Sequence, residues 1–171
     1  MNLRAATADD AERVVRFWHD AGASMGPLDT VAHVRGAITH PAARLLLAEA
    51  GGALVGTLLG TFDGWRGNMY RLVVHPDWRR QGIARQLVKR MEQFFGEAGA
   101  RRITVLIEVD RPWAVEFWTA VGYPRDHHIV RRLLIVVAVR IAVGTAHHEL
   151  AGWYPEIGLT VARIDFRGRS I

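Results

Sequence analysis

Apolar residues recur at helical spacing in two segments near the start of the chain. Residues 8–21 carry such a stripe, and the Thr7 hydroxyl followed by the Asp10 carboxylate is typical of a helix start. A second stripe covers residues 31–38 and stops before His40-Pro41, a pair that a helix rarely passes. With the short apolar stretch ahead of them, these patterns predict one strand followed by two helices.

From residue 44 the apolar period changes from helical to extended. Apolar runs are separated by turns, of which Gly51-Gly52 has the chemistry of a two-residue hairpin and residues 63–67 that of a longer one. Within that longer turn, Asp63 and Arg66 are expected to set the turn and to pair with each other. The pattern predicts three strands joined by hairpins, at residues 45–48, 54–62 and 69–74.

The longest helical stripe covers residues 82–98 and ends at Gly99. Residues 102–109 are rich in β-branched side chains and predict a strand, and residues 113–121, between Pro112 and Gly122, predict a helix. The apolar run at 133–143 is typical of a buried strand. The resulting order is β, α, α, three strands, α, β, α, β, which is typical of an α/β domain.

The composition is that of a globular protein. The chain has 171 residues, of which 50% are hydrophobic and 23% charged, and it has no Cys. These values exclude disorder, disulfides, thiolate metal sites and Cys nucleophiles. The N-terminus has no apolar secretory segment, and the longest apolar run, 133–143, contains Arg140 and is shorter than the ~18 residues of a membrane span. We expect a cytoplasmic protein with no membrane partner.

Positive charge is concentrated in the second half. Residues 1–78 hold 7 Arg against 8 acids, whereas the remainder holds 15 basic groups against 9 acids, which gives a net charge of +5. The arginines are scattered among apolar runs and form no nucleic-acid motif, so no nucleic-acid partner is expected. The His147-His148-Glu149 run lacks the second His that a zinc helix needs four residues later, so no metal is expected.

The polar turn before the long helix has the chemistry of an anion site. A helix begins with about four backbone N–H groups that lack partners and carry partial positive charge. Gly82 and the small Ala84 let an anion approach this backbone. Three neighbouring arginines, Arg79, Arg80 and Arg85, supply charge-assisted donors. An ordinary turn with solvated arginines is the alternative, but the combination favours a phosphate-binding loop.

Arg79, Gly82 and Ala84 form the pattern Arg, two residues, Gly, one residue, Ala. This pattern resembles the signature of the GNAT superfamily of acyl-CoA-dependent N-acetyltransferases, which is Arg or Gln, two residues, Gly, one residue, Gly or Ala. The resemblance covers residues 1–133 and includes Gly56-Thr57, the turn at 63–67, Phe117-Trp118 and Val121-Gly122-Tyr123. It implies an α/β fold with a central mixed, mainly antiparallel sheet flanked by helices.

The resemblance also implies a binding site for acetyl-CoA. Its pyrophosphate would lie on the backbone amides of residues 80–85, and its pantetheine arm would pair like a strand with residues 72–74. Parallel strands that separate leave unpaired N–H and C=O groups, which an amide-bearing arm can satisfy. The expected cofactor-binding residues are Leu72, Val73, Val74, Arg79, Arg80, Gln81, Gly82, Ile83, Ala84, Arg85, Arg111 and Trp118.

The implied reaction moves the acetyl group to a primary amine of a small molecule or a protein. Because the chain has no Cys, direct attack in a ternary complex is expected. Where many family members have a Tyr acid and, seven residues earlier, an Asn, this chain has Trp118 and Arg111, so the acid is not assigned. Glu108 is the first candidate for the general base, and Tyr70 is an alternative polar group.

The substitutions at Trp118 and Arg111 leave a second class of function open, an acyl-CoA-binding sensor or interaction module without turnover. The acceptor is not specified by the sequence. Four acidic residues in the first half favour a cationic acceptor, namely Asp20, Asp29, Glu49 and Asp63.

The tail extends beyond the part of the chain that the family explains. Residues 1–133 are expected to form the acetyltransferase domain, and residues 134–171 a C-terminal extension with extra strands packed on the same domain. Three interpretations of this extension remain open: it extends the sheet, covers the acceptor site, or pairs with a second subunit in a homodimer.

Overall fold

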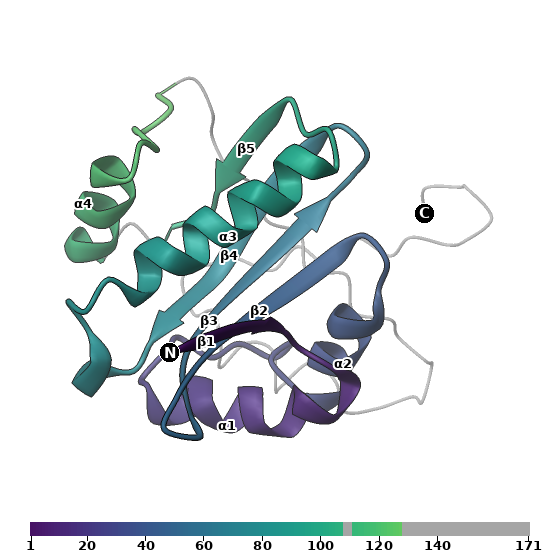
Figure 1. The fold of residues 1–171 in the computed structure, drawn as a ribbon, viewed down its shortest axis with the longest axis vertical. Coiled ribbons are helices and arrows are strands. Elements are labelled where there is room, and N and C mark those ends of the chain that lie inside the picture. Colours follow the sequence, from purple (N-terminus) through teal and green to yellow (C-terminus); the bar gives the residue numbers. More distant parts are fainter. Residues whose placement is uncertain (108–110, 128–171) are drawn as a thin grey trace, which may run out of the picture. The chain divides into compact units, whose positions relative to one another are not determined.

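The computed structural model describes residues 1–107 and 111–127 (Figure 1). The chain divides into two units, Met1–Ile129 and Val130–Ile171, and every described residue belongs to the first. The predicted strands of the C-terminal extension and the candidate base Glu108 lie outside the described residues.

The described residues form a five-stranded sheet in the order β1-β2-β3-β4-β5. Neighbouring strands are antiparallel except for the parallel pair β4 and β5. The strands are β1 (Asn2–Ala5), β2 (Ala43–Ala50), β3 (Ala53–Phe62), β4 (Arg66–Val74) and β5 (Arg102–Val105). The helices are α1 (Ala11–Asp20), α2 (Val31–Thr39), α3 (Ile83–Glu97) and α4 (Pro112–Ala120), with short 3₁₀ helices η1 (Ala8–Asp10) and η2 (Pro76–Trp78). The predicted mixed, mainly antiparallel sheet flanked by helices is therefore confirmed.

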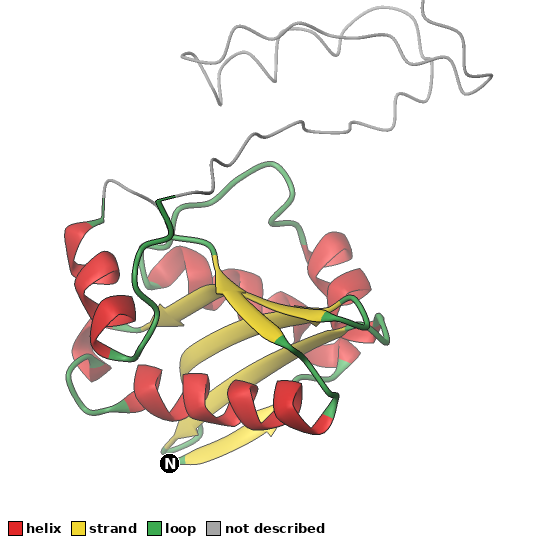
Figure 2. Cartoon of the chain, turned by 90° about the horizontal axis from the view of Figure 1, so that it is seen from above, coloured by secondary structure: helices red, strands yellow, loops and turns green. Residues whose placement is uncertain are grey.

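Helices cover both faces of the sheet (Figures 1 and 2). α3 packs across β2, β3 and β4 on one face, and its buried side chains form one core cluster together with Trp118 of α4. α1 and α2 contribute to a second cluster that contains Trp18. β3 is central and covered on both faces, which is why residues 54–60 are all buried and show a continuous apolar run instead of alternation.

The predicted turn and cap residues form the expected local structure. The Asp10 carboxylate accepts hydrogen bonds from the Thr7 backbone N–H (2.7 Å) and hydroxyl (3.0 Å). The first turn of the predicted helix is 3₁₀ and α1 begins at Ala11. Asp10, at the end of this turn, accepts two hydrogen bonds of 2.7 Å from Arg4. Gly51 and Gly52 have φ of +57° and +80°, as a two-residue hairpin requires.

β5 is shorter than the strand predicted at 102–109. It pairs with β4 only from Arg102 to Val105. Leu106 N–H still donates to the Met69 carbonyl (3.1 Å), but neither Leu106 nor Ile107 is part of a strand. β4 continues for five residues beyond Met69, so β5 pairs with only the first part of β4.

Candidate functional site

β4 contains a bulge just after the point where β5 ends. Thr57 of β3 lies opposite Val73 and Leu59 opposite Tyr70, so two β4 residues, Arg71 and Leu72, face one residue of β3. Arg71 has a φ of +57°, which is unusual for a residue other than glycine. From this point onward, the extra residue changes which β4 residues point their backbone N–H and C=O groups toward β3.

Backbone groups of successive β4 residues point alternately toward β3 and away from it. His75 N–H donates to the Val55 carbonyl (3.0 Å), so in the antiparallel ladder Val73 also turns its N–H and C=O toward β3. Leu72 and Val74 therefore turn theirs to the opposite side, where no described strand pairs with them. We call these backbone groups of Leu72 and Val74 the open edge of β4. Of the three residues expected to pair with a ligand, only these two have a backbone oriented to do so.

The open edge leads directly into the predicted phosphate-binding loop. Two loop residues have left-handed backbone, Arg80 (φ +60°) and Gly82 (φ +80°), the latter as the N-cap of α3. The first helical hydrogen bond runs from Gln86 N–H to the Gly82 carbonyl (3.1 Å). Within the described part of the chain, none of the six backbone N–H groups of residues 80–85 donates a hydrogen bond. This is the arrangement expected of a site for a diphosphate.

Arginine side chains surround this loop. Arg80 and Arg85 are exposed. Arg79 crosses toward α4: its Nε donates to the Val74 carbonyl (3.3 Å), and its guanidinium carbon lies 5.5 Å from the ring centroid of Trp113, which is 57% exposed. The loop, the open edge and the first turn of α4 therefore meet at one place. The three arginines supply cationic groups there that can hold an anion.

The sequence is similar to proteins of one family. The model of the acetyltransferase (GNAT) family matches residues 9–123. A curated relative, an acetyltransferase of Photorhabdus laumondii, is 31% identical over 127 residues, which cover 74% of this chain and 89% of the relative. The chain belongs to the GNAT acetyltransferase family.

Solved structures have the same fold. A transcriptional regulator from Bacillus halodurans is 25% identical, with a TM-score of 0.64 over 78% of this chain and 99% of that protein. A predicted acetyltransferase from Clostridium acetobutylicum, solved with acetyl-CoA, has the same fold, with a TM-score of 0.64 at 15% identity over 77% of this chain and 95% of that protein.

Arg111 and Trp118 of this acetyltransferase lie in different environments. Arg111 is the N-cap of α4, and its Nη2 donates to the Ser24 hydroxyl (2.9 Å) in the connection between α1 and α2. Trp118 is 4% exposed and packs edge-on against Phe117 and Tyr123, with centroids 5.4 and 5.3 Å away. The burial of Trp118 fits an anchor that fixes α4 on α3, and its contact with a cofactor stays a prediction.

Tyr70 is partly buried on the face that α1 and α2 cover. Burial raises the pKa of the Tyr70 hydroxyl, and a hydrogen bond from Thr61 lowers it by a smaller amount. At neutral pH the phenol is therefore protonated and suits donation better than proton abstraction. Glu108, the other catalytic candidate, lies outside the described residues.

Three of the four acids expected to favour a cationic acceptor are already paired with arginines. Asp29 binds Arg71, Glu49 binds Arg4 (3.0 Å) and Arg13 (2.6 Å), and Asp63 binds Arg66 (3.3 Å). The last pair confirms the predicted hairpin turn, in which Asp63 also accepts the Trp65 backbone N–H (2.9 Å). These carboxylates are therefore poor evidence for a cationic acceptor.

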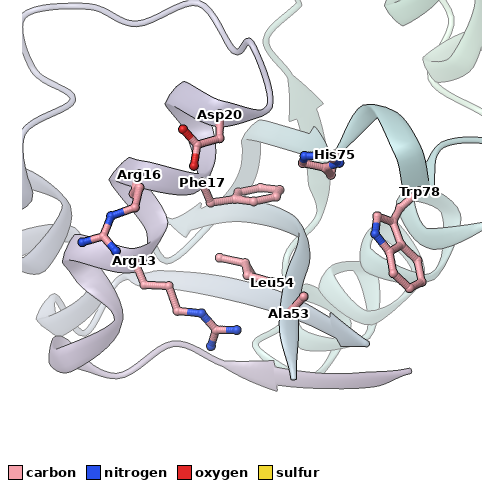
Figure 3. A pocket seen from close by; sticks show the side chains of 8 residues that line it. All are labelled: Arg13, Arg16, Phe17, Asp20, Ala53, Leu54, His75 and Trp78. Atoms are coloured by element: carbon pink, nitrogen blue, oxygen red, sulfur yellow. The ribbon is translucent and has the colours of Figure 1, made fainter. Parts of the chain in front are cut away.

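An open cavity of about 340 Å³ lies on the α1 side of the sheet (Figure 3). None of the predicted cofactor-binding residues lines it. Its lining combines apolar and charged side chains: Arg13, Arg16, Phe17, Asp20, Ala53, Leu54, His75 and Trp78. Arg13 and Arg16 are bonded to Glu49 (2.6 Å) and Glu12 (2.8 Å), so the cationic rim of this cavity is neutralised by its own neighbours.

No helix among the described residues is long and apolar enough to cross a membrane. No group of three His, Asp or Glu side chains in residues 1–107 and 111–127 is arranged to hold a metal ion.

Sequence reasoning missed Arg71 and Trp113. A left-handed arginine in a strand has no local signal, because the bulge arises from the register between β3 and β4. The sequence places Trp113 only in the first turn of a helix, next to Pro112, and gives no signal for its exposure beside the loop.

Proposed function

We propose that this family member transfers the acetyl group of acetyl-CoA to a primary amine by direct attack in a ternary complex. The observation that supports this most is the continuity between the open edge of β4 and the six N–H groups of residues 80–85. One elongated ligand with amides at one end and a diphosphate at the other would use both.

The residues present fit acetyl-CoA. The N–H groups of residues 80–85 would hold its pyrophosphate, with charge-assisted donors from Arg79, Arg80 and Arg85. The backbone of Leu72 and Val74 would pair with the amides of its arm, after Arg79 Nε releases the Val74 carbonyl. When bound, acetyl-CoA supplies an activated acyl group as a thioester.

The chain must also handle protons. An attacking amine has to be neutral, and the departing thiolate needs a proton. We assign the general base to Glu108 and a donor role to Tyr70, whose hydroxyl is protonated at neutral pH. Trp118 has no hydroxyl, and its side chain is in the core, so the proton for the thiolate would come from Tyr70 or from water.

Release of CoA thiol tests this proposal. Purified full-length protein is mixed with acetyl-CoA and, in turn, spermidine, kanamycin and a lysine-containing peptide. The proposal predicts amine-dependent thiol release and intersecting double-reciprocal plots, as a ternary complex requires. Parallel plots would contradict direct attack, because they indicate a covalent acyl-enzyme.

A second function is favoured by one observation. The α4 position at which many relatives have a Tyr carries the buried Trp118, which is compatible with a sensor that binds acyl-CoA and does not consume it. Tight acetyl-CoA binding with no thiol release in the presence of any of the three amines would support the sensor.

A further inference from the structure

Arg71 connects the bulge in β4 to another segment far away in the sequence. Its backbone carbonyl accepts a hydrogen bond from the Thr57 hydroxyl (3.2 Å), and that hydroxyl in turn accepts one from the Trp18 indole N–H (2.9 Å). Its guanidinium carbon lies 5.1 Å from the ring centroid of Trp18. Both ends of this residue are thus held, which keeps a non-glycine residue in the left-handed region.

The guanidinium holds the connection between α1 and α2, residues 21–30. Arg71 Nη1 donates to the Ser24 carbonyl (2.6 Å), and Nη2 binds the Asp29 carboxylate. Asp29 also accepts the Gly26 backbone N–H (2.6 Å). The side chains of Arg71 and Asp29 are only 24% and 10% exposed, so this ion pair is weakly screened by solvent.

The same connection is bonded from the other side. Arg111, at the start of α4, donates to the Ser24 hydroxyl (2.9 Å). Ser24 is therefore bonded both to the strand that carries the open edge and to the helix that follows β5. These partners are 47 and 87 residues away in the sequence, so the contacts fix the connection to the folded core.

The direction of β4 relates this arrangement to the proposed function, on which the inference rests. A cofactor arm that starts at the phosphate-binding loop passes Val74 first and Leu72 next. It would therefore run toward Arg71, with its acyl end on the side of the connection that Arg71 holds. An acceptor amine must reach the acyl group at this place.

We propose that Arg71 and Asp29 are positioning residues that hold residues 21–30 beside the acyl group and thereby orient the acceptor amine. Neither residue contacts the phosphate-binding loop, so the pair affects the acceptor and not the affinity for acetyl-CoA. Orientation of the amine enters both its KM and kcat, because a displaced connection binds it less well and in fewer productive poses.

Asp29→Asn in the full-length protein tests the proposal. The amide keeps the size of the side chain and an oxygen for the Gly26 N–H, but loses the charge that binds Arg71. Asp63→Asn is the matched control, because Asp63 also pairs with a β4 arginine and accepts turn N–H groups, at the start of β4 and away from residues 21–30. Arg71→Lys keeps the positive charge but loses the two-pronged guanidinium. Its exchange rate at residues 21–30 and its kcat/KM should lie between those of wild type and of Arg71→Gln.

Three measurements are compared. Amide hydrogen exchange of residues 21–30 should become at least tenfold faster in Asp29→Asn and unchanged in Asp63→Asn. The Kd for acetyl-CoA should stay within twofold of wild type in both. The kcat/KM for whichever of spermidine, kanamycin and the lysine peptide the wild type acetylates should fall at least tenfold in Asp29→Asn only.

Each contrary result has one meaning. Unchanged exchange in Asp29→Asn overturns the proposal, because the pair then does not hold the connection. Faster exchange with unchanged kcat/KM, or an equal loss of acetyl-CoA affinity, also overturns it. If the wild type binds acetyl-CoA but acetylates none of the three amines, the proposed function fails separately, while the exchange measurement still decides whether Arg71 and Asp29 hold residues 21–30.

Discussion

Gly82 and Gly99 lie at opposite ends of α3 and share one backbone conformation, with φ of +80° and +83°. At neither site does a residue other than the two chain neighbours have an atom within 4 Å of the position that a Cβ would occupy. A side chain at either site is therefore strained by the backbone alone, at a cost of ~1–2 kcal/mol. The two glycines differ in what they adjoin, since only Gly82 belongs to the phosphate-binding loop.

This pair separates a loss of stability from a loss of binding. Gly82→Val should abolish detectable acetyl-CoA binding, because the side chain and the altered backbone interfere with the N–H groups of the loop. Gly99→Val should lower the free energy of unfolding by a similar ~1–2 kcal/mol and leave the Kd within twofold. Calorimetric titration and urea unfolding of both variants measure the two effects, and retained affinity in Gly82→Val would remove the loop from the cofactor site.

Thr57 is a buried polar residue that links α1 to the bulge. Thr57→Val leaves the Trp18 indole N–H without its acceptor at a site that is 2% exposed, so we expect a loss of ~1–3 kcal/mol in the free energy of unfolding. Thr104→Val, in β5, is the control, because the Thr104 hydroxyl forms none of the hydrogen bonds found among the described residues; its effect should be within ~0.5 kcal/mol. Equal urea midpoints for the two variants would contradict this role of Thr57.

Asp10 makes stability depend on pH at the acid end. Hydrogen bonds from Arg4 lower the pKa of the Asp10 carboxyl, those from Thr7 add to this, and burial opposes them. Because the folded-state pKa lies below the unfolded value of about 3.9, this stabilisation is present above pH ~4 and is lost as the pH falls through the folded-state pKa. In Asp10→Asn the free energy of unfolding should be ~1.5–3 kcal/mol lower at pH 7, and it should fall less steeply than in wild type below pH ~4.

The exposed neighbour Asp9 provides the control for this experiment. Asp9→Asn should follow the wild-type curve of unfolding free energy against pH from 7 to 2. An Asp10→Asn curve parallel to wild type in the acid range would show that the Arg4 contact contributes nothing to the pH dependence.

Glu108→Gln tests the assignment of the general base. Loss of a general base typically slows turnover by ~10²-fold or more, and the deficit should shrink at high pH, where the amine is already neutral. Glu97→Gln, an exposed residue at the end of α3, should have wild-type kinetics. The pH profile of kcat/KM for the amine acceptor measures both, and unchanged kinetics in Glu108→Gln would exclude it from the mechanism.

Elements with a long periodic signal are predicted closely from the sequence. The stripe over 82–98 corresponds to α3 at Ile83–Glu97, and the stripe over 31–38 with the Pro after His40 corresponds to α2 at Val31–Thr39. Gly51-Gly52 and Asp63 form the expected hairpins. In each case the signal is local, because a few adjacent residues determine the conformation.

The geometry of the candidate site depends on contacts that no local pattern encodes. Val73 was expected to offer its backbone together with Leu72 and Val74, but the register with Thr57 turns it toward β3. The ion pair of Arg71 and Asp29 joins residues 42 positions apart, and it neutralises a carboxylate that the composition alone counted as an attraction for cationic acceptors. Register and long-range pairing are properties of the assembled sheet.

Titration of the full-length protein with acetyl-CoA, followed by free CoA and dephospho-CoA, tests the central claim most directly. The site described above predicts saturable binding of acetyl-CoA and CoA. Dephospho-CoA should bind more weakly, because it lacks the 3′-phosphate that an arginine would contact. Absence of binding by all three would contradict the account, and the loop at residues 80–85 would then be a turn without a ligand.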